Sequence, residues 1–191
     1  MRTFFLTLIF AFQTMLTFAQ SSDHLTFKGV PIDGTLSVYI SKMKQNGFTH
    51  IKTEDGVAML KGDFASYKGC IVGVATLKGK DLVSKITVIF PTQDSWSMLS
   101  SNYFNLKELL TEKYGEPFES IEEFSSYEPE DDGSKMTQVH LDACKYITNY
   151  KTSKGDIQLL IKGDISNAFV ILAYYDKINS EIIRKKSKDD L

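Results

Sequence analysis

The chain has 191 residues, with 22 Lys and Arg against 24 Asp and Glu, and a formal net charge of −2. Nucleic-acid-binding domains commonly carry a basic face and a high pI, so this balance argues against nucleic acid as a partner. Beyond Arg2 the sequence has a single arginine, Arg184. Because arginine is the preferred bidentate ligand of phosphate groups, the composition also disfavours a phosphate-handling enzyme.

Residues 1–19 have the pattern of a secretory signal peptide. A start that contains Arg2 precedes an apolar run from Phe4 to Phe18, and the small residue Ala19 follows. The run of about fifteen residues is shorter than the roughly 20 that cross a bilayer, and no second run of this kind follows. We therefore expect cleavage near Ala19 and a periplasmic or secreted protein that has no membrane span after the leader is removed.

The first part of the predicted mature chain contains one helix followed by strands. Residues 20–30 are expected to form an N-terminal arm or strand. A helix is predicted from Thr35, because its apolar residues recur at spacings of three and four, and it ends at Gly47. Alternating or apolar runs then predict strands at 57–60, 68–77 and 82–90. We treat residues 31–91 as the first helix-plus-meander unit.

The same order recurs in the second part of the chain. A helix begins after Ser95, and its apolar residues Trp96, Leu99, Tyr103, Leu106 and Leu110 form one stripe. Gly115 and Pro117 end it, because glycine suits the residue after a helix and proline cannot continue one. Strands are predicted at 118–124, 139–150, 157–161 and 169–175. Residues 95–176 form the second unit, and 177–191 a C-terminal helix and charged tail.

This order predicts an α+β fold: an antiparallel sheet flanked by helices, built from two tandem helix-then-three-strand units. It resembles the beta-lactamase inhibitor protein-like fold, and similar units occur in small envelope proteins of the outer-membrane assembly lipoprotein type. The residues that carry the resemblance are the helix ends Gln45-Asn46-Gly47-Phe48 and Lys113-Tyr114-Gly115-Glu116-Pro117, each with its following strands. The resemblance implies a protein-binding role. The Phe-Ala-Gln end of the leader and the excess of lysine over arginine resemble exported proteins of the Bacteroidetes group.

Two cysteines, Cys70 and Cys144, lie in or at the start of predicted strands, in different halves of the chain. In an oxidising compartment they would form a disulfide that joins the halves. The alternative is that both are small buried side chains with free thiols. The sequence leaves both possibilities open.

No motif for catalysis, metal binding or nucleotide binding is present, so we expect a non-enzymatic protein without a cofactor. The acidic segment Glu128–Gly133 lacks the Glu that a calcium loop places about six residues after its glycine, and it is expected to be a solvated loop. The three histidines, His24, His50 and His140, do not lie at metal-ligand spacing from one another.

The predicted function is an exported binding or inhibitor-like module that recognises another envelope or secreted protein through an open sheet face. Tyrosine is favoured at interfaces because it buries a large area at low entropic cost. Candidates for this face are Tyr67, Tyr146, Tyr150 and Tyr174, together with Tyr175; alternatively these rings complete the core. A rival interpretation is a periplasmic carrier of a small molecule or lipid, with a pocket between helices and sheet. That pocket would be lined by Met43, Met59, Phe64 and Trp96.

Overall fold

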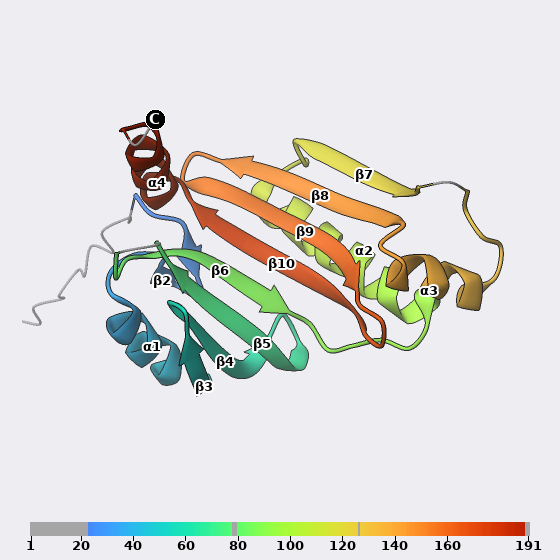
Figure 1. Cartoon of the computed structure of the whole chain (residues 1–191), viewed down its shortest axis with the longest axis horizontal. Coiled ribbons are helices and arrows are strands. Elements are labelled where there is room, and N and C mark those ends of the chain that lie inside the picture. Colours follow the sequence, from blue (N-terminus) through green and yellow to red (C-terminus); the bar gives the residue numbers. More distant parts are fainter. Residues whose placement is uncertain (1–22, 78–79, 126, 190–191) are drawn as a thin grey trace, which may run out of the picture.

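The computed structural model describes residues 23–77, 80–125 and 127–189 (Figure 1). The predicted leader, residues 1–19, lies outside them. The helices in the described part are α1 (Leu36–Gln45), α2 (Trp96–Tyr114), α3 (Asp132–His140) and α4 (Lys177–Asp189). The strands are β1 (Thr26–Phe27), β2 (Val30–Pro31), β3 (Thr49–Glu54), β4 (Val57–Phe64), β5 (Tyr67–Thr76), β6 (Val83–Ile89), β7 (Glu119–Phe124), β8 (Cys144–Thr152), β9 (Gly155–Gly163) and β10 (Ala168–Asp176). The predicted α+β class is confirmed.

Eight strands form one antiparallel sheet in the order β3-β4-β5-β6-β10-β9-β8-β7 (Figure 1). Each half of the chain contributes a meander of four strands, and the two meanders meet where β6 pairs with β10. The expectation of three strands per unit is therefore wrong by one in both units. The four strand ranges predicted for the second unit already included β7, whereas β3 of the first unit was missed. Almost every residue of β3 is exposed at the sheet edge, so its sequence lacks the two-residue alternation that marks a half-buried strand.

One face of the sheet carries the core. The inward side chains of the central strands stand in register and are almost fully buried: Leu60, Val72, Val88, Leu172 and Leu159. Helix α1 packs against β3 and β5, and α2 packs against β8, β9 and β10 behind the sheet in Figure 1. The hairpin β1–β2 closes this layer, where the ring of Phe27 contacts those of Phe64 and Tyr174. A single hydrophobic cluster thus serves both halves.

The acidic segment is a helix start. Asp131 accepts a 2.8 Å hydrogen bond from the Ser134 backbone N–H and caps α3, so the expected loop ends at Asp131, and the strand predicted from Val139 begins only at Cys144. The next carboxylate, Asp132, accepts hydrogen bonds from the N–H groups of Trp96 (2.9 Å) and Ser97 (2.8 Å) at the start of α2. These two aspartates satisfy backbone donors at the ends of two helices, which accounts for the acidic composition here.

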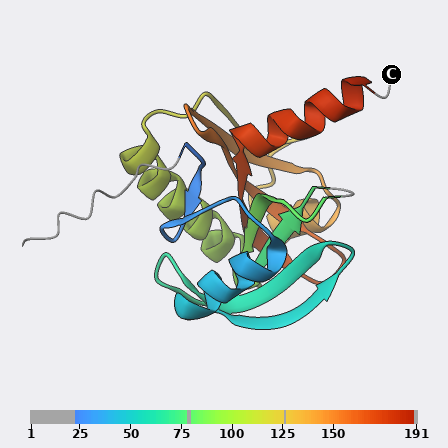
Figure 2. The same cartoon turned by 90° about the vertical axis from the view of Figure 1, so that its left-hand side faces the viewer.

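Helix α4 is anchored at its first turn and then extends away from the body (Figure 2). Asp176 is fully buried and accepts hydrogen bonds from the N–H groups of Leu25 and Asn179, both at 2.9 Å. The Asn179 side chain donates to the carbonyl oxygens of Ile32 (3.1 Å) and Val83 (2.8 Å). The start of α4 is thereby fixed to the N-terminal segment and to β6. In the described part of the chain, no helix combines the length and the apolar character needed to cross a membrane.

Candidate functional site: the open sheet face and the cavity beside α4

The sheet face opposite the core carries a continuous line of aliphatic side chains. Cross-strand pairing places them directly opposite one another on six neighbouring strands: Ile71, Ile89, Ile171, Leu160, Ile147 and Ile121. We call this set the aliphatic row. Since neighbouring strands lie about 4.8 Å apart, the row is roughly 24 Å long.

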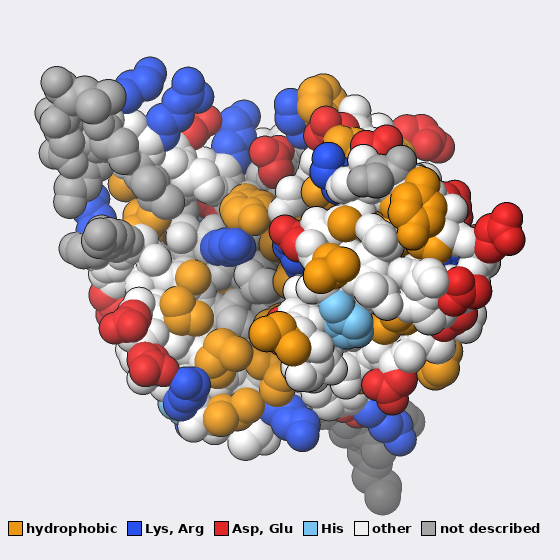
Figure 3. Space-filling model, turned by 45° about the vertical axis from the view of Figure 1, so that its right-hand side comes forward, with side chains coloured by type: hydrophobic (Ala, Val, Ile, Leu, Met, Phe, Trp, Pro, Cys, Tyr) orange, Lys and Arg blue, Asp and Glu red, His pale blue; other side chains and the backbone are white. Residues whose placement is uncertain are grey.

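The aliphatic row is accessible along its length. Its members are half-buried by their neighbours, except for Ile121 near the edge, which is 36% exposed. Helices α1, α2 and α3 pack on the other face, and α4 borders the open face only at the ends of the strands (Figure 1). In the space-filling view, hydrophobic side chains gather on this side of the molecule, with charged side chains around them (Figure 3). Contiguous exposed apolar surface of this kind is typical of interaction sites.

Lysines predominate among the charged side chains of the same face. The basic residues at outward strand positions include Lys52, Lys61, Lys85, Lys145, Lys151 and Lys162, and the acidic ones include Glu54, Glu119, Glu123 and Asp156. On β4, the position that pairs with Ile71 of the aliphatic row is occupied by Lys61. The open face is therefore slightly basic, although the whole chain has a net charge of −2.

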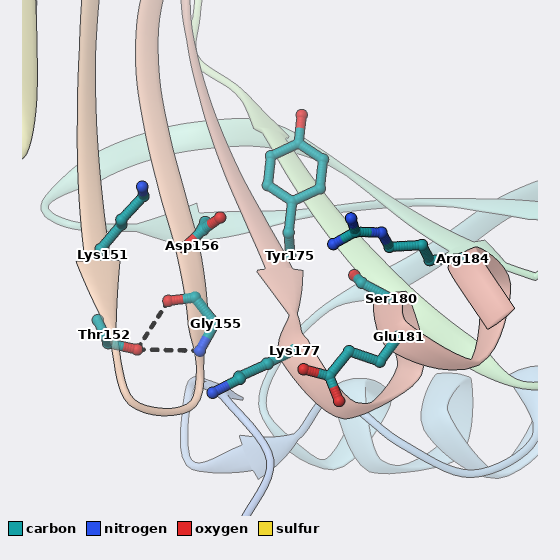
Figure 4. A pocket seen from close by; sticks show the side chains of 9 residues that line it. All are labelled: Lys151, Thr152, Gly155, Asp156, Tyr175, Lys177, Ser180, Glu181 and Arg184. Atoms are coloured by element: carbon teal, nitrogen blue, oxygen red, sulfur yellow. Dashed lines mark hydrogen bonds between the residues drawn. The ribbon is translucent and has the colours of Figure 1, made fainter.

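A cavity of about 370 Å³ lies where α4 meets the ends of β8, β9 and β10 (Figure 4). Its strand side is formed by Lys151, Asp156 and Tyr175, which stand in register on three neighbouring strands. Its helix side includes Glu181 and Arg184, whose side chains come from α4. A second hollow of about 350 Å³ shares the three strand residues and continues toward β7. The two hollows lie on the open face, over the ends of the strands that are nearest to α4.

The predicted tyrosine face is wrong. Tyr146, Tyr150 and Tyr174 are only 7%, 1% and 4% exposed, because their strand positions point toward the helices. The Tyr150 hydroxyl donates to the Lys107 carbonyl at 3.0 Å and lies 2.9 Å from the Thr111 hydroxyl, so it is held by α2. Tyr67 is half-buried, and its ring packs on that of Phe90. These rings complete the core, as the alternative interpretation proposed; of the five candidates, Tyr175 lies on the open face.

Of the two possibilities that the sequence left open for the cysteines, the disulfide is wrong, and the structure has two buried free thiols. Cys70 on β5 and Cys144 on β8 are both buried and free. Three strands separate β5 from β8, so the two residues are roughly 19 Å apart, given a strand spacing of about 4.8 Å. A disulfide needs Cα atoms within about 7 Å. Burial raises the pKa of the Cys144 thiol to about 12, which leaves it protonated and unreactive.

The four residues expected to line the pocket of a carrier do not form one. Met43 and Trp96 are 0% and 8% exposed and belong to the packed core, whereas Met59 stands on the open face and Phe64 packs on Phe27. The cavities described above lie on the opposite side of the sheet. The four residues therefore do not come together around one pocket.

The histidines make separate contacts. His24 Nδ1 lies 3.0 Å from the Asp176 carboxylate, His50 Nε2 lies 2.8 Å from the Thr53 hydroxyl, and His140 Nδ1 lies 2.6 Å from the Asp164 carbonyl oxygen. Within the described ranges, no group of three or more His, Cys, Asp or Glu side chains is placed to hold a metal ion.

The sequence did contain a signal for the aliphatic row. In the predicted strand at 82–90, both alternating sets of side chains include isoleucine, which is unusual for a strand whose outer face meets water. The other members of the row became recognisable only when the register aligned them. Neither a protein-family model, nor a curated protein, nor a solved structure matches this chain.

Proposed function

We propose that this chain is an exported, non-enzymatic binding module that docks another envelope or secreted protein on its open sheet face. The observation that carries the proposal is the aliphatic row: aliphatic residues in register on six adjacent strands, on the face that α1, α2 and α3 leave uncovered. Burying such a row releases ordered water from a large apolar area, which is the main favourable contribution in most protein association.

The geometry of a sheet supports this role. The row's side chains are β-branched or short, and they are held by paired strands on both sides. They therefore lose little conformational freedom when a partner covers them. The lysines around the row would favour a partner whose contact surface is acidic at its rim. The resemblance to the beta-lactamase inhibitor protein-like fold is consistent with such a role. The carrier alternative has less support, because Met43 and Trp96 are packed into the core.

Site-specific photo-crosslinking in the producing cell tests the proposal. A photoreactive phenylalanine is placed at Ile147 in the row, or at Met98, which is 59% exposed on α2 away from the open face. The expected result is one defined protein crosslinked from position 147, none from position 98, and loss of the product when Leu160→Asp is added. Equal crosslinking from both positions, or no product from position 147, would contradict the proposal.

A further inference from the structure

We propose that the cavity between α4 and the ends of β8–β10 binds a small organic monoanion, a carboxylate attached to a planar apolar group. The site is separate from the aliphatic row, and this inference does not depend on the proposed protein-binding function. It rests on the arrangement of Tyr175, Arg184 and the charged residues around them (Figure 4).

The guanidinium group of Arg184 is available for a ligand. Arg184 lines the cavity, and its side chain points from α4 toward the Tyr175 ring (Figure 4). Within the described part of the chain, no ion pair or hydrogen bond engages its guanidinium group. Lys177 lines the same cavity, and so does Lys151, whose ammonium group lies 3.5 Å from the centroid of the Phe118 ring. A planar guanidinium group binds a carboxylate through two parallel hydrogen bonds, so Arg184 is the expected anchor.

The acidic residues of the cavity restrict the charge of the ligand. Asp156 and Glu181 contribute two negative charges, against three positive charges from Lys151, Lys177 and Arg184. The lining therefore has a net charge of +1 (3 − 2). A single carboxylate would neutralise this excess charge, whereas a phosphate dianion would leave the filled site with a net charge of −1. Ser180, also in the lining, offers a further hydroxyl donor.

Tyr175 provides an aromatic surface for the apolar part of the ligand. Its ring is half-buried on the strand side of the cavity, and the Lys85 ammonium group lies 4.8 Å from the ring centroid. The Lys85 contact holds the ring in place, and planar groups favour offset stacking or edge contacts with aromatic rings. The volume of about 370 Å³ lies at the lower end of the range for small-molecule sites, so a compact one- or two-ring ligand would fill it.

The inference is tested by measuring the binding of naphthalene-2-carboxylate to the mature chain with titration calorimetry and NMR. The controls are the uncharged isostere naphthalene-2-carboxamide and inorganic phosphate. We expect saturable binding of the carboxylate, with affinity lower by about tenfold for the carboxamide and for the Arg184→Gln variant. Tyr175→Ala should weaken the binding of the carboxylate by a similar factor. Lys145→Gln removes an exposed lysine from the same face outside the cavity and should leave binding unchanged.

Three results would overturn the inference: no binding of the carboxylate at millimolar concentration, equal binding of the carboxamide, or equal binding to Arg184→Gln. Phosphate that binds as tightly as the carboxylate would show a simple anion site and also reject the proposed ligand class. Leu160→Asp should retain carboxylate binding while losing the crosslinked partner. A failure of this inference is therefore distinguishable from a failure of the proposed function.

Discussion

Ile171 of β10 lies directly opposite Ile89 of β6, and this pair joins the last strands of the two meanders. Through it, the two halves of the chain form one sheet with a single core. The aliphatic row crosses this junction, with two of its members on the first half and four on the second. The open face is therefore a property of the whole chain, because neither half contains the complete row.

The neighbouring residues Leu159 and Leu160 on β9 provide a matched pair for testing which face is open. Leu159 is 0% exposed in the core, whereas Leu160 is half-buried in the aliphatic row. We expect Leu159→Asp to lower the free energy of unfolding by about 4 kcal/mol or more, because it buries an unpaired carboxylate. Leu160→Asp should cost less than about 1 kcal/mol, since its carboxylate remains in water. Urea unfolding measures both, and similar losses would mean that the row is covered in the isolated chain.

Removing the hydroxyl group from each of two buried tyrosines should change the free energy of unfolding in opposite directions. The Tyr39 hydroxyl is buried and has no hydrogen-bond partner in the described part of the chain, whereas the Tyr150 hydroxyl is bonded to α2. Tyr39→Phe should raise the free energy of unfolding by about 1 kcal/mol, because it removes an unsatisfied polar group from the core. Tyr150→Phe should lower it by about 1 kcal/mol. Chemical denaturation of the two variants beside the parent checks the difference, and destabilisation by Tyr39→Phe would show that its hydroxyl has a partner.

The free cysteines lead to a prediction about reduction. Because Cys70 and Cys144 lie on strands separated by three others, a reductant should leave the melting temperature unchanged. Burial raises the pKa of both thiols, so neither should react with a thiol reagent in the folded protein. Titration after unfolding without reductant should find two thiols per chain. A result of zero thiols, with a melting temperature that falls on reduction, would mean that the bond forms and that the sheet order is incorrect.

Stability should decline at alkaline pH. Burial raises the pKa of Tyr103 and Tyr174, and raises that of Tyr146 to about 12. In the unfolded chain tyrosine titrates near pH 10, so above this pH the unfolded state loses protons that the folded state retains. The free energy of unfolding is therefore unaffected by these groups below about pH 10 and falls as the pH rises from about 10 to 12.

Urea midpoints between pH 8 and pH 12, together with phenolate absorbance, measure this effect. Phenolate from the buried rings should appear together with unfolding. Tyr146→Phe is the internal control and should reduce the slope of stability against pH. If the buried rings ionise reversibly while the protein remains folded, the packing inferred for them is incorrect.

The sequence by itself determined the kinds of element and many of their ends. The stripe from Trp96 to Leu110 and the terminators Gly115 and Pro117 specified α2, because helical periodicity and capping act over only a few residues. Alternation in the predicted strands likewise separated the side chains into two sets. It failed for β3, which is exposed on nearly all sides, and for α3, which was not predicted as a helix.

Only the tertiary structure decided which set of side chains meets water and which strands are neighbours. The burial of Tyr146, Tyr150 and Tyr174 depends on the face that α1 and α2 cover, and the separation of Cys70 from Cys144 depends on the pairing of β6 with β10. These contacts join residues about 80 positions apart, as in the pair Ile89 and Ile171. A local pattern shows that a strand has two faces, but long-range packing selects the one that is buried, and therefore the one that is free to bind.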